Sequence, residues 1–441
     1  MYLISQVEIE GFWGKYKVDV RVNPDINIFI GKNGTGKTTF INMLSAVLKV
    51  DLKSLLILDF KKISIFLKSY DDATNADPDM ISVIKTITVV KSLIDDKPDQ
   101  LISYTLDDSK DKKYDIVLNL RDIDMLMRNS RRRALIGASF QELEKRISLL
   151  INISSLTVHR ITFDYSEEDY NYTNRNGFVV PHIDQRLNEL MVRLKSYQLN
   201  LAKKNDEISS NLQKEVLKSI LYNRDFDLFS MDNLNSVLTT EKEELITAYR
   251  ELGVYDDNIG KKINSHTKVI NKSIAKLQKI RLDDSLPLTA NDVMPISLLK
   301  RTQHIIRQSL KAKEDKHQIS ELIDLYIEII KKFICDKQIS ISQNGDLQIN
   351  IETKEILLSD LSSGEKQLLI ILTEALLQEN TPYIFLADEP ELSLHIEWQR
   401  KIIPSILMLN PSAQVIVATH SPEIAGSGKG KIIDMEDIRN V

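Results

Sequence analysis

The sequence predicts an α/β fold that is interrupted by a long helical insertion. Three short apolar runs, at residues 26–30, 383–388 and 415–418, end abruptly at a glycine, an acidic pair and a Thr-His pair. Buried strands of a parallel sheet end in this way. In the middle of the chain, apolar residues instead recur at steps of three and four, which is typical of helices that wind about each other. The low content of glycine (14) and proline (11) also favours long helices.

Composition limits the class of protein further. The 441 residues are too many for one compact core, and 42% apolar and 27% charged residues exclude a disordered chain. The net charge of −5 excludes a uniformly basic nucleic-acid coat, although a local basic patch stays possible. Cys335 is the single cysteine, so no intrachain disulfide and no multi-cysteine zinc site can form. We expect Cys335 to be a small buried hydrophobic residue.

The chain carries no recognisable targeting segment. Its start, MYLISQVEIEGFWGKY, lacks a basic region followed by an apolar stretch. No window reaches the roughly 18 apolar residues of a membrane span. The nearest, Leu368–Leu377, contains Glu374. The sequence therefore predicts a cytoplasmic protein without a membrane partner.

The N-terminal part alternates strands with few helices. A strand pair is predicted over residues 3–22, and a helix over 38–50 follows the apolar run at 26–30. A polar stretch at 107–113 predicts an antiparallel hairpin between two later strands. The further elements expected are strands at 63–67, 83–90, 101–106, 114–120 and 156–160 and a helix at 140–152.

The character of the sequence changes near residue 165. From Ile183 to Leu212 the apolar residues form a seam with a period close to 3.5, which more often packs within a chain than between chains. Helices are expected over 239–282 and 296–335, with breaks at Pro287 and Pro295. Strands resume after Ile339, with Asn344 and Gly345 as a hairpin turn. The predicted domains are residues 1–164 and 336–441, which form one head, and the helical insertion 165–335.

A glycine-rich segment follows the first apolar run. Residues 31–39 read GKNGTGKTT and fit the pattern G-x-x-x-x-G-K-[ST]. Glycines let the backbone curl so that N–H groups face phosphate oxygens, and the helix that follows adds its positive end. Lys37 is expected at the β- and γ-phosphates and Thr38 at Mg²⁺. The residues predicted to bind nucleotide here are Lys32, Asn33, Gly34, Thr35, Gly36, Lys37, Thr38 and Thr39.

The apolar run at 383–388 delivers two carboxylates to the end of a strand. Open α/β sheets bind ligands at this edge. We expect Asp388 to hold the Mg²⁺ water shell and Glu389 to polarise the attacking water. Acidic strand ends are common, so this segment alone is weak evidence for a nucleotide site. It becomes strong evidence together with the glycine-rich loop.

Two further segments have an ordinary structural explanation beside the functional one. LSSGEKQ (361–367) precedes an apolar helix, which Ser362 or Ser363 can cap, with Glu365 in its first turn. The run at 415–418 leads to His420, and a lone histidine at a strand end is commonly structural.

Taken in order, the four segments resemble the ATP-binding-cassette (ABC) ATPases, in the branch of SMC, RecF and OLD-like proteins. The resemblance covers about residues 1–164 and 336–441. DEPELSLH (388–395) is particularly close to the OLD-like pattern. In that family GKNGTGKTT is the Walker A motif, LSSGEKQ the signature motif, FLADEP the Walker B motif and ATHSP the switch histidine.

This resemblance implies a P-loop ABC-ATPase head, with a mixed sheet and an antiparallel β subdomain, interrupted by a coiled-coil-like insertion. It implies that ATP and Mg²⁺ lie between two heads, in a homodimer or a higher even-numbered assembly. Each signature motif then faces the phosphate loop of the other head. Glu389 is the implied catalytic carboxylate and His420 the implied γ-phosphate contact. The signature residues expected at the nucleotide are Ser362, Ser363, Gly364 and Glu365.

The chain departs from the family in two places. Val158, His159 and Arg160 stand where a Q-loop glutamine is expected, so the residue that links nucleotide to the insertion is open. Ser363 replaces the first glycine of the commonest signature. In addition, OLD-like nucleases carry a TOPRIM domain after the ATPase, whereas 21 residues follow His420 here. We therefore expect any nuclease activity to come from another polypeptide.

The combination resembles the ATPase subunits of prokaryotic anti-phage systems, first that of PARIS, paired with a TOPRIM nuclease, and second that of Septu, paired with an HNH nuclease. This resemblance implies an ATP-hydrolysing sensor and scaffold that restrains a nuclease effector until a phage-encoded trigger acts. The alternative is a DNA-binding repair ATPase of RecF or SMC type. A transporter subunit is a third alternative, which the long helical insertion argues against.

Charge is unevenly distributed. Residues 261–313 contain twelve basic and three acidic residues, a net charge of +9. Lys268, Lys272, Lys276 and Lys279 recur at helical spacing. This basic segment is either a contact for DNA or an acidic trigger protein, or a solvated helix face. Arg131–Arg133 is a weaker basic cluster.

Overall fold

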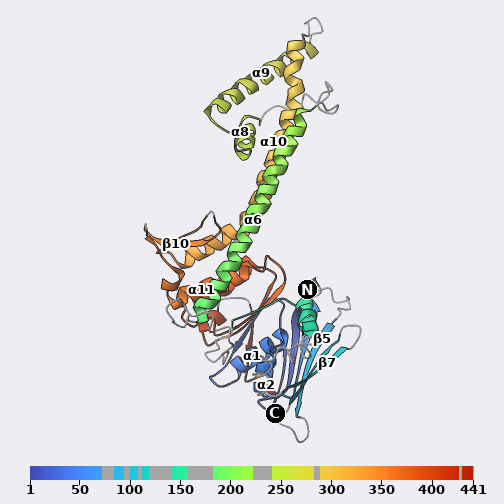
Figure 1. Cartoon of the computed structure of the whole chain (residues 1–441), viewed down its shortest axis with the longest axis vertical. Coiled ribbons are helices and arrows are strands. Elements are labelled where there is room, and N and C mark those ends of the chain that lie inside the picture. The colour runs from blue at the N-terminus through green and yellow to red at the C-terminus, as the bar shows by residue number, and fades with distance from the viewer. Residues whose placement is uncertain are drawn as a thin grey trace, which may run out of the picture. The chain divides into compact units, whose positions relative to one another are not determined.

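The computed structural model forms two compact units, which we call the head (Met1–Leu194 with Leu325–Val441) and the arm (Lys195–Asp324). Figure 1 shows the course of the chain. The structure describes residues 1–71, 84–93, 100–107, 112–118, 141–156, 182–221, 241–282, 289–342, 344–352, 354–426 and 430–440.

A five-stranded sheet in which all pairs are parallel forms the centre of the head. Its order is β14-β3-β13-β12-β8. All six residues of β12 and of β13 are buried, as their uninterrupted apolar sequences predict. The strands are β3 (Ile26–Ile30), β8 (Ile153–Leu156), β12 (Tyr383–Asp388), β13 (Ala413–Ala418) and β14 (Lys431–Asp434).

A seven-stranded antiparallel sheet packs beside it, in the order β15-β2-β1-β4-β5-β6-β7. The buried amide N–H of Ile4 donates to Gln414 Oε1 at 2.9 Å, which joins the two sheets. The predicted hairpin is present as the antiparallel pair β6–β7. The strands are β1 (Tyr2–Phe12), β2 (Tyr16–Arg21), β4 (Lys62–Ser69), β5 (Ile84–Leu93), β6 (Gln100–Leu106), β7 (Lys112–Leu118) and β15 (Arg439–Asn440).

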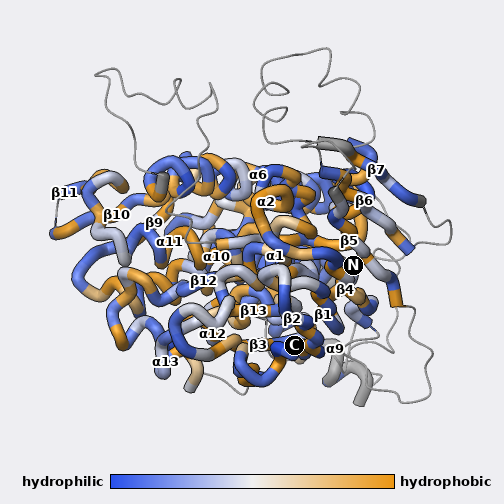
Figure 2. Tube along the Cα trace, turned by 90° about the horizontal axis from the view of Figure 1, so that it is seen from below, coloured by the Kyte–Doolittle hydropathy of each residue, from blue (hydrophilic) through white to orange (hydrophobic). Residues whose placement is uncertain are grey.

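A small antiparallel sheet, β11-β10-β9, completes the head. In Figure 2 it lies on the opposite side of β3, β12 and β13 from β4–β7. A further helix covers residues 141–150. The remaining elements are β9 (Gln338–Ile341), β10 (Leu347–Ile351), β11 (Lys354–Glu355), η3 (Leu358–Asp360), α1 (Lys37–Lys49), α2 (Leu52–Ile57), α11 (Ser363–Leu376), α12 (Ile396–Leu409) and α13 (Pro422–Ala425).

Between the two parts of the head, the described residues form four long or medium helices: α6 (His182–Ile220), α8 (Glu241–Glu251), α9 (Asp257–Leu282) and α10 (Ala290–Phe333). The predicted seam is present on α6, where Leu187, Leu190 and Leu194 are buried. No helix among the described residues is long and apolar enough to cross a membrane. The mixed α/β fold with long helices that the sequence predicts is confirmed.

Two expectations, on Pro295 and Cys335, were wrong, and one helical stretch is divided. Pro295 does not break a helix, because it lies in the second turn of α10 and removes only one backbone hydrogen bond near the helix end. The helical stretch expected at 239–282 is present as two helices, α8 and α9, because Gly253 adopts φ +72° and the chain turns between them. Cys335 is exposed, because it lies two residues past the end of α10.

Several predictions fall outside the described residues. These are the Arg131–Arg133 cluster, the segment Val158–Arg160 in place of a Q-loop, and the boundary at residue 165.

Candidate functional site

The glycine-rich loop connects β3 to α1 at the carboxyl edge of the parallel sheet. Gly31, Gly34 and Gly36 have φ of 141°, 79° and 98°, which L side chains rarely adopt. A Cβ at Gly36 would approach the Phe12 ring to 2.7 Å. The loop therefore needs glycine at Gly36 both for its backbone conformation and for its packing.

The ammonium group of Lys37 lies inside this loop. Its Nζ donates to the backbone oxygens of Gly31 at 2.8 Å and Lys32 at 3.1 Å, and the residue is buried. Burial lowers the pKa of Lys37, whereas the carboxylates of Glu389 and Asp388 act in the opposite direction. Lys37 is thus a buried cation beside two acids, where a phosphate group could be held.

Thr38 and Asp388 meet across this edge of the sheet. Thr38 Oγ1 donates to Asp388 Oδ1 at 3.1 Å. Burial raises the pKa of Asp388, and the nearby Glu389 and Glu391 raise it further. A hydroxyl beside a buried carboxylate is a pair of hard oxygen ligands, which suits Mg²⁺. These two residues would hold the ion, which would neutralise phosphate charge there.

Glu389 and His420 face each other at the ends of β12 and β13. Glu389 Oε1 lies 3.8 Å from His420 Nε2, and both side chains are about one third exposed. Glu389 has φ +46°, a conformation that costs a non-glycine residue about 1–3 kcal/mol. Its backbone N–H donates to Ala418 O at 2.8 Å, which ties it to the next strand. The fold thus holds this carboxylate in a strained backbone position at the sheet edge.

The remaining predicted residues of the loop differ in exposure. Thr35 is buried, and its Oγ1 donates to Lys32 O at 2.9 Å, which closes the loop. Thr39 is half-buried. Lys32, Asn33, Gly34 and Thr38 are exposed.

Glu391 is a site residue that the sequence analysis missed. Its Oε1 accepts hydrogen bonds from Thr419 Oγ1 at 2.6 Å, His420 N at 2.8 Å and Ser421 N at 3.2 Å. One carboxylate oxygen therefore fixes the turn that carries His420. The signal in the sequence was the third acid of DEPE, which can be interpreted only once the two strands are known to be neighbours.

We predict that Glu391→Ala lowers the turnover of ATP without a matching change in KM, because Glu391 positions His420 and does not lie in the phosphate loop. Hydrogen bonds to charged groups contribute about 1.5–3 kcal/mol, so a loss of roughly tenfold or more in kcat is expected. Thr419→Val removes one of the three hydrogen bonds and should cost less. Steady-state ATPase kinetics test this. An unchanged kcat in Glu391→Ala would show that the turn at residues 419–421 keeps its conformation without these hydrogen bonds.

The signature segment lies elsewhere in the head. Ser362 caps α11, and Glu365 completes a capping box with it, so the structural explanation of Ser362 is correct. Glu365 also forms an ion pair with Lys337. A Cβ at Gly364 would lie 2.3 Å from Ser393 O, so glycine allows α11 to approach the loop after β12.

The structure brings together Lys37, Thr38, Asp388, Glu389 and His420 but not the signature residues. Among the described residues, no hydrogen bond or ion pair joins residues 362–365 to residues 31–39. Ser362 and Ser363 are exposed at the start of α11. A helix N-terminus with exposed hydroxyls suits an anion, so this end is available to a second molecule.

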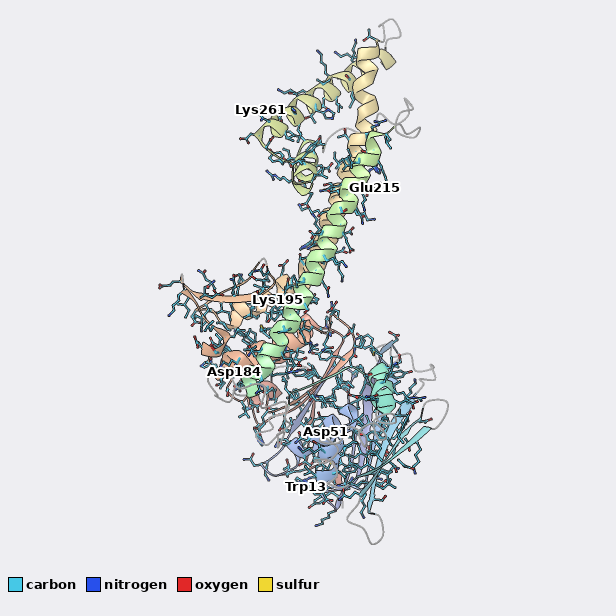
Figure 3. The ribbon with its side chains drawn as sticks, in the orientation of Figure 1. Trp13, Asp51, Asp184, Lys195, Glu215 and Lys261 are labelled. Atoms are coloured by element: carbon cyan, nitrogen blue, oxygen red, sulfur yellow. The ribbon has the colours of Figure 1, made fainter. Side chains whose placement is uncertain are left out.

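Trp13 is a second residue that the sequence analysis missed. Trp13, which Figure 3 labels, occupies the turn between β1 and β2 with φ +55°. Its ring lies 3.1 Å from the position of a Cβ at Gly36. The guanidinium of Arg439 lies 5.8 Å from its ring centroid. A partly exposed aromatic ring against the phosphate loop suits stacking with a nucleotide base. Only the adjacency of the antiparallel sheet to the loop reveals it.

The fold and these contacts define a P-loop nucleotide-binding protein. The family model of the AAA ATPase domain matches residues 1–425, and the chain belongs to this family. Membership implies nucleotide binding.

Two curated relatives are similar. The chain is 26% identical over 327 residues to the probable ATPase of retron Vc95 from Vibrio cholerae serotype O1 biovar El Tor, covering 68% of this chain and 62% of that protein. It is 34% identical over 95 residues to the probable ATPase of retron Ec83 from Escherichia coli, covering 19% and 18%. The chain thus spans less than two thirds of the length of these relatives.

Solved structures of Smc head domains are also similar. One is the Smc head domain with an extended coiled coil, bound to the C-terminal domain of ScpA, from Pyrococcus furiosus, with a TM-score of 0.42 and 14% identity over 98% of this chain and 93% of that chain. Another is the Smc head domain with a coiled coil and joint from Pyrococcus yayanosii, with a TM-score of 0.41 and 14% identity over 98% and 95%.

Proposed function

We propose that two copies of this chain bind and hydrolyse ATP at a shared interface. The observation that carries the proposal is the separation of the two halves of the site. The phosphate loop, Asp388, Glu389 and His420 lie together, whereas Ser362 and Ser363 are exposed on α11 and, among the described residues, form no hydrogen bond or ion pair with that loop. A second head supplies the missing half in this proposal, so the assembly is a homodimer or a higher even-numbered oligomer.

Each side chain has a distinct role in the proposed reaction. The Lys37 ammonium and the loop N–H groups bind the β- and γ-phosphates, and Thr38 with Asp388 holds Mg²⁺. Glu389 orients the attacking water and accepts its proton, because its half-buried carboxylate lies beside the loop. His420 hydrogen-bonds the γ-phosphate, and Glu391 keeps it in place. The positive end of α11 from the partner stabilises charge on the same phosphate.

Within the head, α11 contacts both of the helices, α6 and α10, that continue into the arm. On α6, Asp184, which Figure 3 labels, forms an ion pair with Lys366 at 2.7 Å. Arg186 on the same helix pairs with Glu374. On the last turns of α10, Tyr326 Oη hydrogen-bonds Thr373 Oγ1 at 2.8 Å. Any displacement of α11 on ATP binding therefore acts on both helices that lead to the arm. We propose that this is how the nucleotide state reaches the arm.

Removing Arg186 is predicted to loosen this connection. The side chain of Glu374 is only 3% exposed, so Arg186→Met leaves this buried carboxylate without its ion pair to Arg186. We expect the free energy of unfolding to fall by about 2 kcal/mol. This is below the range of about 3–5 kcal/mol for breaking fully buried ion pairs, because the Arg186 side chain is 34% exposed. Thermal unfolding of the whole chain measures it. Arg193→Met, an exposed change on the same helix, is the control, and equal effects in both would contradict the prediction.

We further propose that the ATPase is a sensor and scaffold of an anti-phage defence system that holds and restrains a separate nuclease. The sequence resemblance to the ATPase subunits of PARIS and Septu supports a TOPRIM or HNH partner, and the likeness to retron ATPases adds a retron as the setting. ATP closes the heads, and a phage-encoded trigger releases the nuclease.

Purification of the full chain with the product of the neighbouring gene tests the defence proposal. We expect a stable complex in which ATP suppresses nuclease activity. Absence of a complex both with and without ATP would overturn it. An ATPase that is stimulated by DNA alone and has no protein partner would favour a repair ATPase of RecF or SMC type.

A further inference from the structure

We propose that one face of α9 binds the phosphate backbone of double-stranded DNA. This helix of 26 residues contains seven basic residues and a single acidic one, Asp257 at its first position. Its net charge of +6 stands inside a chain of net charge −5. The binding itself does not depend on the proposed function; only its biological meaning, DNA as a ligand of the proposed sensor, rests on it.

The lysines of α9 lie in a line. Successive residues of an α-helix are about 100° apart, so the five members of this set fall within an arc of roughly 80°. At about 1.5 Å per residue the line is about 27 Å long. All five side chains are exposed. We call this the lysine stripe: Lys261, Lys268, Lys272, Lys276 and Lys279.

The opposite face of α9 packs inside the arm. Ile263, Ile270 and Ile274 are buried, and Ile263 belongs to an apolar cluster with Leu245 of α8 and Ile306 of α10. The packing partners of α9 therefore occupy the face opposite the lysine stripe. Figure 3 shows Lys261 at the end of α9 that lies near α8.

The chemistry of the stripe favours nucleic acid over an acidic protein. Lysine is depleted at protein interfaces, which rely on buried aromatic and apolar anchors. Val269 is the one large apolar residue whose side chain is exposed on the described part of α9. Phosphate contacts, in contrast, need cations and small polar donors, and Ser265 and Asn264 stand exposed beside the stripe.

The stripe also favours a duplex over a single strand. Proteins that bind single strands stack bases on aromatic side chains, and α9 contains no Phe, Tyr or Trp. A straight helix can lie in or along the major groove of B-form DNA, which is wide, whereas that of duplex RNA is too narrow. Four of the five lysines, all except Lys276, form no ion pair with any residue that the structure describes.

The test is binding of the full chain to a fluorescein-labelled DNA duplex of about 20 base pairs, longer than the roughly 8 base pairs that 27 Å spans. Anisotropy is measured without ATP at several salt concentrations. The variant Lys268→Glu/Lys272→Glu/Lys279→Glu should bind at least tenfold more weakly and lower the slope of log K against log salt by about three. The control is Lys203→Glu/Lys204→Glu/Lys214→Glu, which reverses three exposed lysines on α6.

Binding that is lost in the stripe variant and kept in the control supports the proposal. It is overturned by no binding at low salt, by equal losses in both variants, or by tighter binding of single-stranded DNA, duplex RNA or polyglutamate. Basal ATPase activity should be unchanged in both variants, because none of the six lysines lies in the head. The binding assay contains no nucleotide, so a chain that does not bind DNA would not contradict the proposed ATPase activity. Conversely, a chain that does not hydrolyse ATP could still be tested for DNA binding.

Discussion

Replacing Lys37 with alanine is expected to abolish ATP binding and turnover. Lys37 is the buried cation of the glycine-rich loop, and its ammonium group lies within hydrogen-bond distance of the loop backbone. No other described residue places a buried cation there, so the phosphate charge would be left without compensation. We expect kcat/KM to fall by about 10²–10³ or more, as for loss of a preorganised charge donor.

Nucleotide binding and steady-state hydrolysis measure this loss. Lys32→Ala is the matched control, since Lys32 lies in the same loop but its side chain is 85% exposed and only approaches Glu436 at 3.9 Å. We expect that variant to lose far less. Wild-type affinity for ATP in Lys37→Ala would contradict the assignment of the loop.

The variant Glu389→Gln is expected to bind ATP and retain it unhydrolysed, with the heads closed. The amide keeps the size of the side chain but cannot accept the proton of water, so we expect kcat to fall by about 10²–10⁴. The strained backbone of Glu389 is fixed by Ala418 O, and the substitution leaves that bond in place. ATP that copurifies with the variant, in a larger assembly than the wild type forms, is the expected result.

Glu397→Gln provides the comparison for this variant. Glu397 is an exposed acid in the first turn of α12, near the same segment in sequence. Its turnover should equal that of the wild type. Near-normal turnover in Glu389→Gln would instead remove Glu389 from the catalytic role.

The parallel sheet and its edge were predictable because apolar runs without alternation must be buried on both faces. This holds for β3, β12 and β13. Parallel pairing then places their carboxyl ends at one edge, so Asp388, Glu389 and His420 were expected near the loop. The start of α11 was also predictable, because Ser362 and Glu365 have the spacing of a capping box.

The features that were missed depend on contacts between distant parts of the chain. Glu391 acts on Thr419 and His420 only because β12 pairs with β13, and an acid after a proline carries no such signal by itself. Trp13 reaches the loop only through the packing of the antiparallel sheet. The error at Pro295 has a different origin, since the cost of proline in a helix falls near the N-terminus and the sequence did not show where α10 begins.

The central claim is that each ATP site is shared between two chains. It is tested most directly by coexpressing two inactive chains with different tags, one with Lys37→Ala and one with Ser363→Arg, and purifying only the mixed assembly. Ser363 is exposed, so the arginine disturbs the signature end of α11 without entering the core. A mixed pair contains one intact loop facing one intact signature, so the account predicts roughly half of the wild-type rate. Activity no higher than that of the two parent variants would contradict it.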